Sequence, residues 1–249
     1  MFSGKKALIT GGSRGIGRAC AIHLAEHGAD VAINYLRNVS AAEETAEQVR
    51  SRGSQALLLK YNVGKVENIQ EMFSELKEKW GGLDIFISNA VLGVLRPADV
   101  FPEKGWEMTV DINAKAYLFC AQEAVKLMEG RRRGHIVALS SIGSIRCMPG
   151  YSVIGASKAA IETLTRYLAL ELAPRNINVN CVSGGPIDTD ALRAFPNYEE
   201  LIAETASKTP LGRMGTPEDL ANVVVWLCSD ESSWVTGQTI IADGGLTLM

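Results

Sequence analysis

A glycine-rich segment near the start of the chain has the residue types that bind the phosphates of a dinucleotide. It is Thr10-Gly11-Gly12-Ser13-Arg14-Gly15-Ile16-Gly17, and it stands between a short apolar run and a helical stretch. Gly11 permits a sharp turn, Gly15 lets the backbone approach a pyrophosphate, and Gly17 permits close packing of helix on strand. The helix that follows directs its free N–H groups and positive dipole end at the phosphates. With this strand before it and helix after it, the segment predicts a dinucleotide site rather than a plain turn.

The residues after the second apolar run indicate which nicotinamide cofactor binds. A site for NAD needs an Asp or Glu there, to accept a hydrogen bond from the ribose 2′-hydroxyl. The chain instead has Asn34-Tyr35-Leu36-Arg37, and Arg14 lies in the glycine-rich segment. Two guanidinium groups suit a 2′-phosphate, which would repel a carboxylate. We therefore expect NADPH; the alternative is that Arg37 is a solvated surface residue.

A tyrosine and a lysine later in the chain form a second candidate for chemistry. They stand at the two ends of Tyr151-Ser152-Val153-Ile154-Gly155-Ala156-Ser157-Lys158. Seven residues are about two helical turns, so both side chains can share one face of a helix. The alternative is that Tyr151 is a half-buried aromatic residue at a helix start and that the chain has no activity.

These residues must be positioned by alternating strands and helices. Strands without polar alternation are predicted at Lys5–Thr10, Val31–Tyr35, Ala56–Lys60, Asp84–Ser88, Ile136–Ser140, Ile177–Val182 and Thr239–Ala242. Helices are predicted at Gly15–Gly28, Ala41–Arg52, Val66–Lys79, Glu103–Glu129, Ser152–Leu172 and Pro217–Ser229. Apolar strands of this kind suit a sheet covered on both faces. Right-handed crossovers then give an α/β fold, a doubly wound parallel sheet formed by residues 1–249 as a single domain.

One stretch interrupts this alternation, between the sixth strand and the last long helix. Ser183–Thr216 contains three prolines around a weak helix near Tyr198–Ala206. A long insertion at the carboxyl end of a strand is usually functional, so we expect a substrate lid over about 190–210. Its apolar wall, with Arg193 beside it, would be Leu192, Phe195, Tyr198, Leu201 and Ile202.

The sequence resembles the short-chain dehydrogenase/reductases over nearly its whole length. Besides the glycine-rich segment, the similar stretches are Asn62-Val63, Ser88-Asn89-Ala90, Asn113, Ser140-Ser141, Gly185-Pro186-Ile187-Asp188-Thr189, Gly237-Gln238-Thr239 and Asp243-Gly244-Gly245. The resemblance implies a Rossmann fold in which Asn62 and Val63 hold the adenine and Asn89 and Ala90 line the cofactor. It implies that Ile187 and Thr189, beside Gly185 and Pro186, hold the nicotinamide carboxamide and phosphate. Val91 replaces the family's usual glycine, which would narrow the cofactor cleft.

The spacing of Tyr151 and Lys158 departs from the usual pattern of that family. Most members place the tyrosine four residues before the lysine, where this chain has Ile154. Tyrosine seven residues before lysine resembles the family's enoyl-acyl-carrier-protein reductases, and most closely their NADPH-dependent type III of Bacillus-like bacteria. By that resemblance Tyr151 stabilises or protonates the enolate, while Lys158 binds the nicotinamide ribose and lowers the pKa of Tyr151. Ser141 would hydrogen-bond the substrate, with Ser140 as the alternative, and Asn113 would hold a helix kink and a water.

The displaced tyrosine has a chemical use. Reduction of an enoyl thioester puts hydride on the β-carbon while negative charge develops on a more distant oxygen, where stabilisation must be aimed. We therefore expect NADPH-dependent reduction of the trans-2 double bond of enoyl-acyl-carrier-protein thioesters in fatty-acid elongation. The alternative is a reductase of 3-oxoacyl thioesters or other carbonyls in the same family. A third possibility is a non-catalytic dinucleotide sensor.

Composition limits the partners. A net charge of -3 provides no basic field for nucleic acid, and no apolar run approaches the ~20 residues of a membrane span. The five cysteines are far apart and suggest reduced thiols, and the first residues leave no room for a secretion signal, so we expect a cytoplasmic protein. We expect no metal site. The resemblance implies acyl-carrier protein as partner and a homotetramer formed through the long helices Glu103–Glu129 and Ser152–Leu172.

Overall fold

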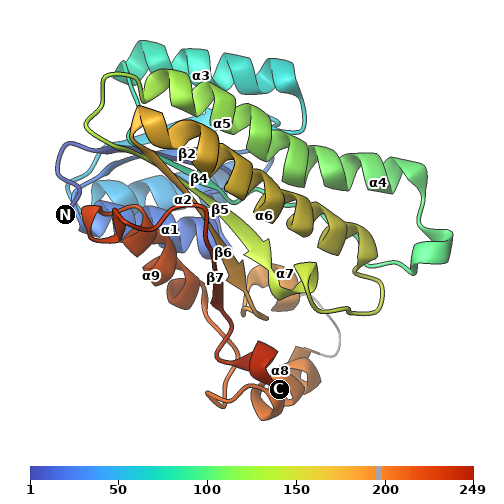
Figure 1. Ribbon diagram of the computed structural model, residues 1–249. Coiled ribbons are helices and arrows are strands. Elements are labelled where there is room, and N and C mark those ends of the chain that lie inside the picture. The colour runs from blue at the N-terminus through green and yellow to red at the C-terminus, as the bar shows by residue number, and fades with distance from the viewer. Residues whose placement is uncertain (194–197) are drawn as a thin grey trace.

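Residues 1–193 and 198–249, which the computed structural model describes, form a seven-stranded parallel sheet with helices on both faces (Figure 1). The strand order is β3-β2-β1-β4-β5-β6-β7. The strands are β1 (Lys6–Ile9), β2 (Asp30–Tyr35), β3 (Ala56–Lys60), β4 (Ile85–Ser88), β5 (Gly134–Ser141), β6 (Ile177–Gly184) and β7 (Thr239–Ala242). The helices are α1 (Gly15–Glu26), α2 (Val39–Arg50), α3 (Val66–Trp80), α4 (Glu103–Val110), α5 (Ala116–Leu127), α6 (Ser152–Leu172), α7 (Asp190–Arg193), α8 (Tyr198–Lys208) and α9 (Pro217–Leu227). The predicted doubly wound sheet is confirmed.

Two apolar cores lie on opposite faces of the sheet, because successive side chains of a strand point to opposite sides. Leu8 packs in the core beneath α3, α5 and α6, whereas Ala7 and Ile9 pack against α1, α2 and α9. Figure 1 shows these two helical layers above and below the strands. Since both faces are covered, the strands need apolar residues at every position, which is the pattern that the sequence shows.

The carboxyl ends of the strands meet at one edge of the sheet. The chain runs outward from β1 through β2 to β3 and then returns to β4 on the other side of β1. The strand order reverses between β1 and β4, which leaves a crevice outside the carboxyl ends of these strands. In open α/β sheets, ligands bind in this crevice. The segments that follow β1, β4, β5 and β6 therefore converge on one site.

Most predicted element boundaries lie within two residues of the observed ones. Two of the differences bear on the site. Strand β5 continues to Ser141 and β6 to Gly184, because these two residues still pair in the parallel ladder. Ser141 is thus the last residue of a central strand, and its backbone is held by the sheet.

The helix predicted over Glu103–Glu129 is not continuous. A π-helical turn at Asp111–Lys115 separates α4 from α5. Its Asn113 is buried, with Oδ1 accepting from the Leu92 amide at 2.9 Å and Nδ2 donating to the Leu92 carbonyl at 3.0 Å and the Ser157 hydroxyl at 2.9 Å. Turns of this kind are frequent at functional sites. The wide turn places Asn113 where it ties the segment after β4 to α6.

Candidate active site

The glycine-rich loop between β1 and α1 has the backbone geometry that its sequence predicts. Gly11 and Gly15 have φ of +63° and +54°, which side chains disfavour. At Gly17 a Cβ atom would lie 2.5 Å from the Gly11 carbonyl oxygen. The N-cap residue of α1, Arg14, provides no side-chain hydrogen bond, and the first turn of the helix holds no acidic residue. The first N–H groups of α1 are therefore open to an anion such as a pyrophosphate.

The end of β4 is attached to this loop. Thr10 Oγ1 accepts hydrogen bonds from the backbone N–H groups of Asn89 at 3.1 Å and Ala90 at 3.2 Å. Asn89 Nδ2 in turn donates to the carbonyls of Thr10 at 3.0 Å and Gly11 at 2.9 Å. The side-chain amide of Asn89 thus holds the loop in place.

The adenosine end of the crevice is open and carries positive charge. Arg14 and Arg37 are exposed, and neither side chain forms a hydrogen bond or ion pair with another described residue. Asn34 at the end of β2 donates to the carbonyls of Leu59 and Tyr61 and so joins β2 to β3 rather than facing solvent. Beyond β3, Asn62 Oδ1 accepts from the Gly64 amide at 3.0 Å, and Val63 is buried.

Thr189 closes the crevice from the β6 side. A Cβ atom at Gly15 would lie 3.6 Å from Thr189 Cγ2, so this threonine lies over the start of α1. Ile187 pairs with Gly215 in an isolated bridge, which fixes the segment that follows β6. The predicted phosphate-binding loop and the predicted nicotinamide-binding segment are therefore neighbours.

Asp188 links this segment to the predicted lid. Arg193 donates to both of its carboxylate oxygens at 2.8 Å, and the Tyr198 hydroxyl donates to Oδ1 at 2.7 Å. The Arg193 guanidinium lowers the pKa of Asp188 to about 2. The predicted weak helix is present as α8, preceded by α7, and Asp188 joins both to the end of β6. Phe195, predicted for the lid wall, lies outside the described residues.

Tyr151 lies beside Ser141. A Cβ atom at Gly143 would lie 2.4 Å from Tyr151 Cε1, so the tyrosine ring packs directly on the backbone of the turn that follows Ser141. Burial raises the pKa of the Tyr151 hydroxyl, and the neighbouring Ser141 hydroxyl opposes that rise. The phenol is therefore protonated at neutral pH and can donate a proton to an oxygen bound at this pair.

Lys158 is buried two turns further along α6. Its Nζ donates to the Leu139 carbonyl at 2.8 Å, and burial lowers its pKa to about 8. The expectation that Lys158 lowers the pKa of Tyr151 is wrong for this structure. The pKa of Tyr151 is raised, and Ser141 is the residue that opposes the rise.

Ile154, at the family's usual tyrosine position, is buried and packs on Gly93. A Cβ atom at Gly93 would lie 2.3 Å from Ile154 Cδ1. The residue four before Lys158 therefore fills space and supplies no proton.

Ser140 and Ser141 have different surroundings. Ser140 is buried and donates to Glu162 Oε1 at 2.6 Å, whereas Ser141 Oγ accepts from the Gly143 amide at 3.2 Å. Glu162 is a residue of this site that the sequence analysis missed. The side chain of Val91 is 58% exposed, and a narrowing of the crevice by it stays a prediction.

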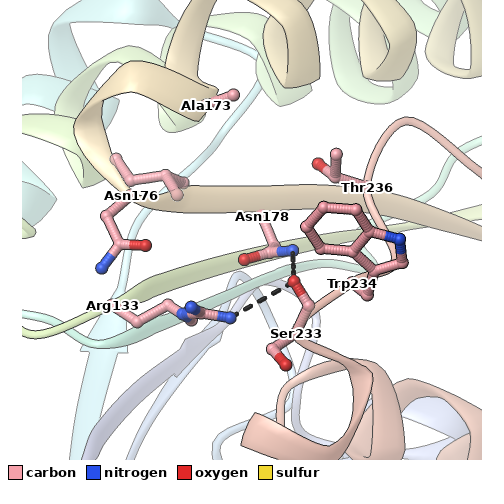
Figure 2. A pocket seen from close by; sticks show the side chains of 8 residues that line it. Arg133, Ala173, Asn176, Asn178, Ser233, Trp234 and Thr236 are labelled. Carbon is pink, nitrogen blue, oxygen red and sulfur yellow. Dashed lines mark hydrogen bonds between the residues drawn. The ribbon is translucent and has the colours of Figure 1, made fainter.

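A separate cavity of about 350 Å³ lies away from this site (Figure 2). Figure 2 shows Arg133 and Asn178 donating to the Ser233 carbonyl, with the indole of Trp234 beside them. Its wall includes Ile177, the first residue of β6, so it lies at the amino end of that strand. It contains none of the predicted site residues.

Comparison with known proteins shows the family to which this fold belongs. A family profile described as Enoyl-(Acyl carrier protein) reductase matches residues 11–247. A short-chain dehydrogenase/reductase from Serratia marcescens has a solved structure that superposes with a TM-score of 0.93 at 30% identity, covering 99% of each chain. The chain belongs to the short-chain dehydrogenase/reductase family. It is therefore an oxidoreductase of a family that uses NAD(P)H.

Two curated relatives carry more specific names. The 1-cyclohexenylcarbonyl-CoA reductase of Streptomyces collinus is 39% identical over 98% of this chain and 87% of its own length. The 3-oxoacyl-[acyl-carrier-protein] reductase of Staphylococcus aureus is 37% identical over 97% of this chain and 98% of its own. The expected closeness of this short-chain dehydrogenase/reductase to type III enoyl-acyl-carrier-protein reductases is not supported by these relatives. Among the described residues, no helix is long and apolar enough to cross a membrane.

Proposed function

We propose that this protein is an NADPH-dependent reductase of acyl thioesters, with the substrate oxygen bound at the Ser141–Tyr151 pair. The observation that carries the proposal is the Tyr151 ring packed on Gly143, with its protonated hydroxyl beside Ser141. NADPH, when bound, would supply the hydride. Tyr151 then holds or transfers the proton at the oxygen on which negative charge develops.

The residues along the crevice fit such a cofactor. The loop Gly11–Gly17, with Ser13 and Ile16, and the open start of α1 would hold the pyrophosphate. Lys158 would hold the nicotinamide ribose, while Ile187 and Thr189 would hold the carboxamide and the adjoining phosphate. Asn62, Val63, Asn89 and Ala90 would contact the adenosine and line the crevice, and Gly185 and Pro186 belong to the segment after β6.

The two exposed arginines give a prediction about cofactor choice. Removing both by Arg14→Ala and Arg37→Ala should raise the KM for NADPH at least 10-fold, because each charge-assisted hydrogen bond to a phosphate contributes about 1.5–3 kcal/mol. The KM for NADH should change little. Steady-state kinetics with each cofactor measure this, and Arg50→Ala at the end of α2 is the matched control. Equal losses with NADPH and NADH would contradict a 2′-phosphate site.

The names of the relatives favour a carbonyl substrate over the enoyl thioester that the tyrosine spacing predicts. Those names include several 3-oxoacyl-[acyl-carrier-protein] reductases and a tetrahydroxynaphthalene reductase. The first candidate substrate is therefore a 3-oxoacyl thioester, whose ketone oxygen would accept hydrogen bonds from both Ser141 and Tyr151.

A feature of this chain favours the 2-enoyl thioester as a second candidate. Ile154 occupies the position where most family members have the proton-donating tyrosine, and its side chain cannot donate a proton. Tyr151 lies about one helical turn earlier. A donor displaced along α6 suits an oxygen that lies beyond the carbon receiving hydride. The name of the Streptomyces collinus relative, a reductase of a cyclohexenyl-carbonyl CoA thioester, is compatible with such a substrate.

A side-by-side assay separates the two candidates. NADPH oxidation is followed with a 3-oxoacyl thioester and a trans-2-enoyl thioester of equal chain length, each on coenzyme A and on acyl-carrier protein. Oxoacyl turnover alone would establish the first candidate, and enoyl turnover alone would establish the second. A Tyr151→Phe/Ile154→Tyr double variant moves the donor to the usual position and is expected to abolish enoyl reduction. Enoyl reduction retained in that variant would exclude any role for the displaced tyrosine.

We also propose a homo-oligomer, as the family resemblance implies. Large apolar side chains are exposed on α4 and α6, among them Trp106 and Met108 on the first and Tyr167 and Leu170 on the second. Exposed apolar patches of this kind mark interaction sites. A homotetramer would cover them, and sedimentation of the intact chain measures its state.

A further inference from the structure

Glu162 joins two hydroxyl groups that flank Ser141. Its Oε1 accepts from Ser140 Oγ at 2.6 Å and from Ser144 Oγ at 2.6 Å. Ser140 is the penultimate residue of β5, and Ser144 ends the short 3-10 turn that begins at Ile142. Short hydrogen bonds to an ionised acceptor are the stronger ones. One carboxylate oxygen on α6 thus fixes both sides of the turn that carries Ser141 and supports the Tyr151 ring.

Glu162 also lies one helical turn after Lys158. Residues four apart in a helix share a face, and the Glu162 carboxylate raises the pKa of Lys158 against the larger, opposite effect of burial. The other titratable group that acts on Lys158 is Cys181 of β6. Burial raises the pKa of Cys181 to about 12, so this thiol is neutral in the working range. Tyr117 of α5 lies near the same thiol, and burial raises its pKa well above its usual range, so it too is neutral.

We propose that Glu162 is a positioning residue, which holds the turn carrying Ser141 against α6 and places its carboxylate on the face of that helix that carries Lys158. The proposal rests on the proposed reductase function, in which Lys158 binds the cofactor ribose and Ser141 binds the substrate oxygen. It assigns Glu162 two separable effects, one through its hydrogen bonds and one through its charge.

The charge effect is tested with Glu162→Gln, which keeps an oxygen for the two serines but removes the negative charge. The pKa of Lys158 should fall, because the carboxylate that raises it is gone, so the alkaline limb of kcat/KM, near pH 8 in the wild type, should move to lower pH. The affinity for NADPH is measured by the fluorescence of bound NADPH in the absence of substrate. The pH above which this affinity declines should also move to lower pH in the variant. Glu171→Gln, on the exposed side of the same helix, is the matched control.

The hydrogen-bonding effect is tested with Ser140→Ala/Ser144→Ala, which leaves the charge in place. We expect kcat to fall about 10-fold while the alkaline limb stays where it is in the wild type. Glu162→Asp should restore part of the activity lost in Glu162→Gln. Thermal unfolding and near-ultraviolet circular dichroism verify that each variant folds, and Ser144→Ala alone is the milder substitute if the double variant does not.

Two results would overturn the proposal. One is a Glu162→Gln variant whose pH profiles of turnover and NADPH binding superimpose on those of Glu171→Gln. The other is an unchanged kcat in the double serine variant. If the wild-type protein turns over no thioester, the proposed function fails, but the pH profile of NADPH binding still decides the charge effect of Glu162.

Discussion

Replacing Tyr151 with phenylalanine should lower kcat by about 10²–10⁴-fold on whichever thioester the wild-type protein reduces, since this is the usual contribution of a positioned proton donor. The substitution removes the hydroxyl beside Ser141 but keeps the ring that packs on Gly143, so the fold should be retained. Because burial raises the pKa of Tyr151, the wild-type phenol stays protonated well above neutral pH. The loss in the variant should therefore be the same at pH 6 and at pH 7.5.

The measurement is single-turnover NADPH oxidation, because it reports the chemical step rather than product release. Tyr61→Phe is the control, since the Tyr61 hydroxyl donates to Glu75 of α3 at 2.8 Å and not to a residue of the proposed site. It should leave kcat unchanged. A Tyr151→Phe variant with wild-type turnover would remove Tyr151 from the chemistry and leave Ser141 as the remaining hydroxyl near the substrate oxygen.

The sheet and its loop could be predicted from sequence because they depend on local patterns. Strands covered on both faces need apolar residues at every position, and Gly11, Gly15 and Gly17 each stand where a side chain would strain or obstruct the turn. The positive φ of Gly11 and Gly15 and the close approach of Gly17 to Gly11 involve residues close together in the chain. Most boundaries could therefore be placed to within two residues.

The contacts that organise the site could not be predicted, because they join residues that are distant in sequence or lie in irregular segments. Glu162 meets Ser140 from 22 positions away. The orientation of the Tyr151 side chain depends on its packing against Gly143, where a larger residue would clash with the ring. Helical spacing gives no information about this contact. The π-helical turn at Asp111–Lys115 depends on Asn113 meeting Leu92 and Ser157 from two other elements.

The environment of Lys158 also depends on a contact that the sequence does not predict. The family resemblance implies a cationic neighbour that lowers the pKa of Tyr151. In the folded chain the ammonium group donates to the Leu139 carbonyl and is buried, so its own pKa falls to about 8. Its charge is therefore sensitive to pH near 8, so a pH profile of NADPH binding reports on this part of the site.

Substituting Gly17 with alanine should weaken NADPH binding at least 10-fold. The new methyl group would lie 2.5 Å from the Gly11 carbonyl oxygen, 2.6 Å from Asn89 Nδ2 and 2.9 Å from Gly12 Cα. Two of these are backbone atoms, so the loop must move, at a cost of about 1–3 kcal/mol in stability. Such a shift changes the loop that would hold the pyrophosphate and strains the Asn89 contact that holds the loop to β4.

The control for this variant must separate lost stability from lost binding. Gly53→Ala is suitable, because Gly53 has φ of +83° and no atom within 4 Å of the added carbon. It should lower stability through backbone strain alone and leave NADPH affinity as in the wild type. Fluorescence titration with NADPH and thermal unfolding are measured on both variants. If Gly17→Ala bound NADPH as tightly as Gly53→Ala, the glycine-rich loop would not be the pyrophosphate site, and the predicted contacts along the rest of the crevice would need to be reassigned with it.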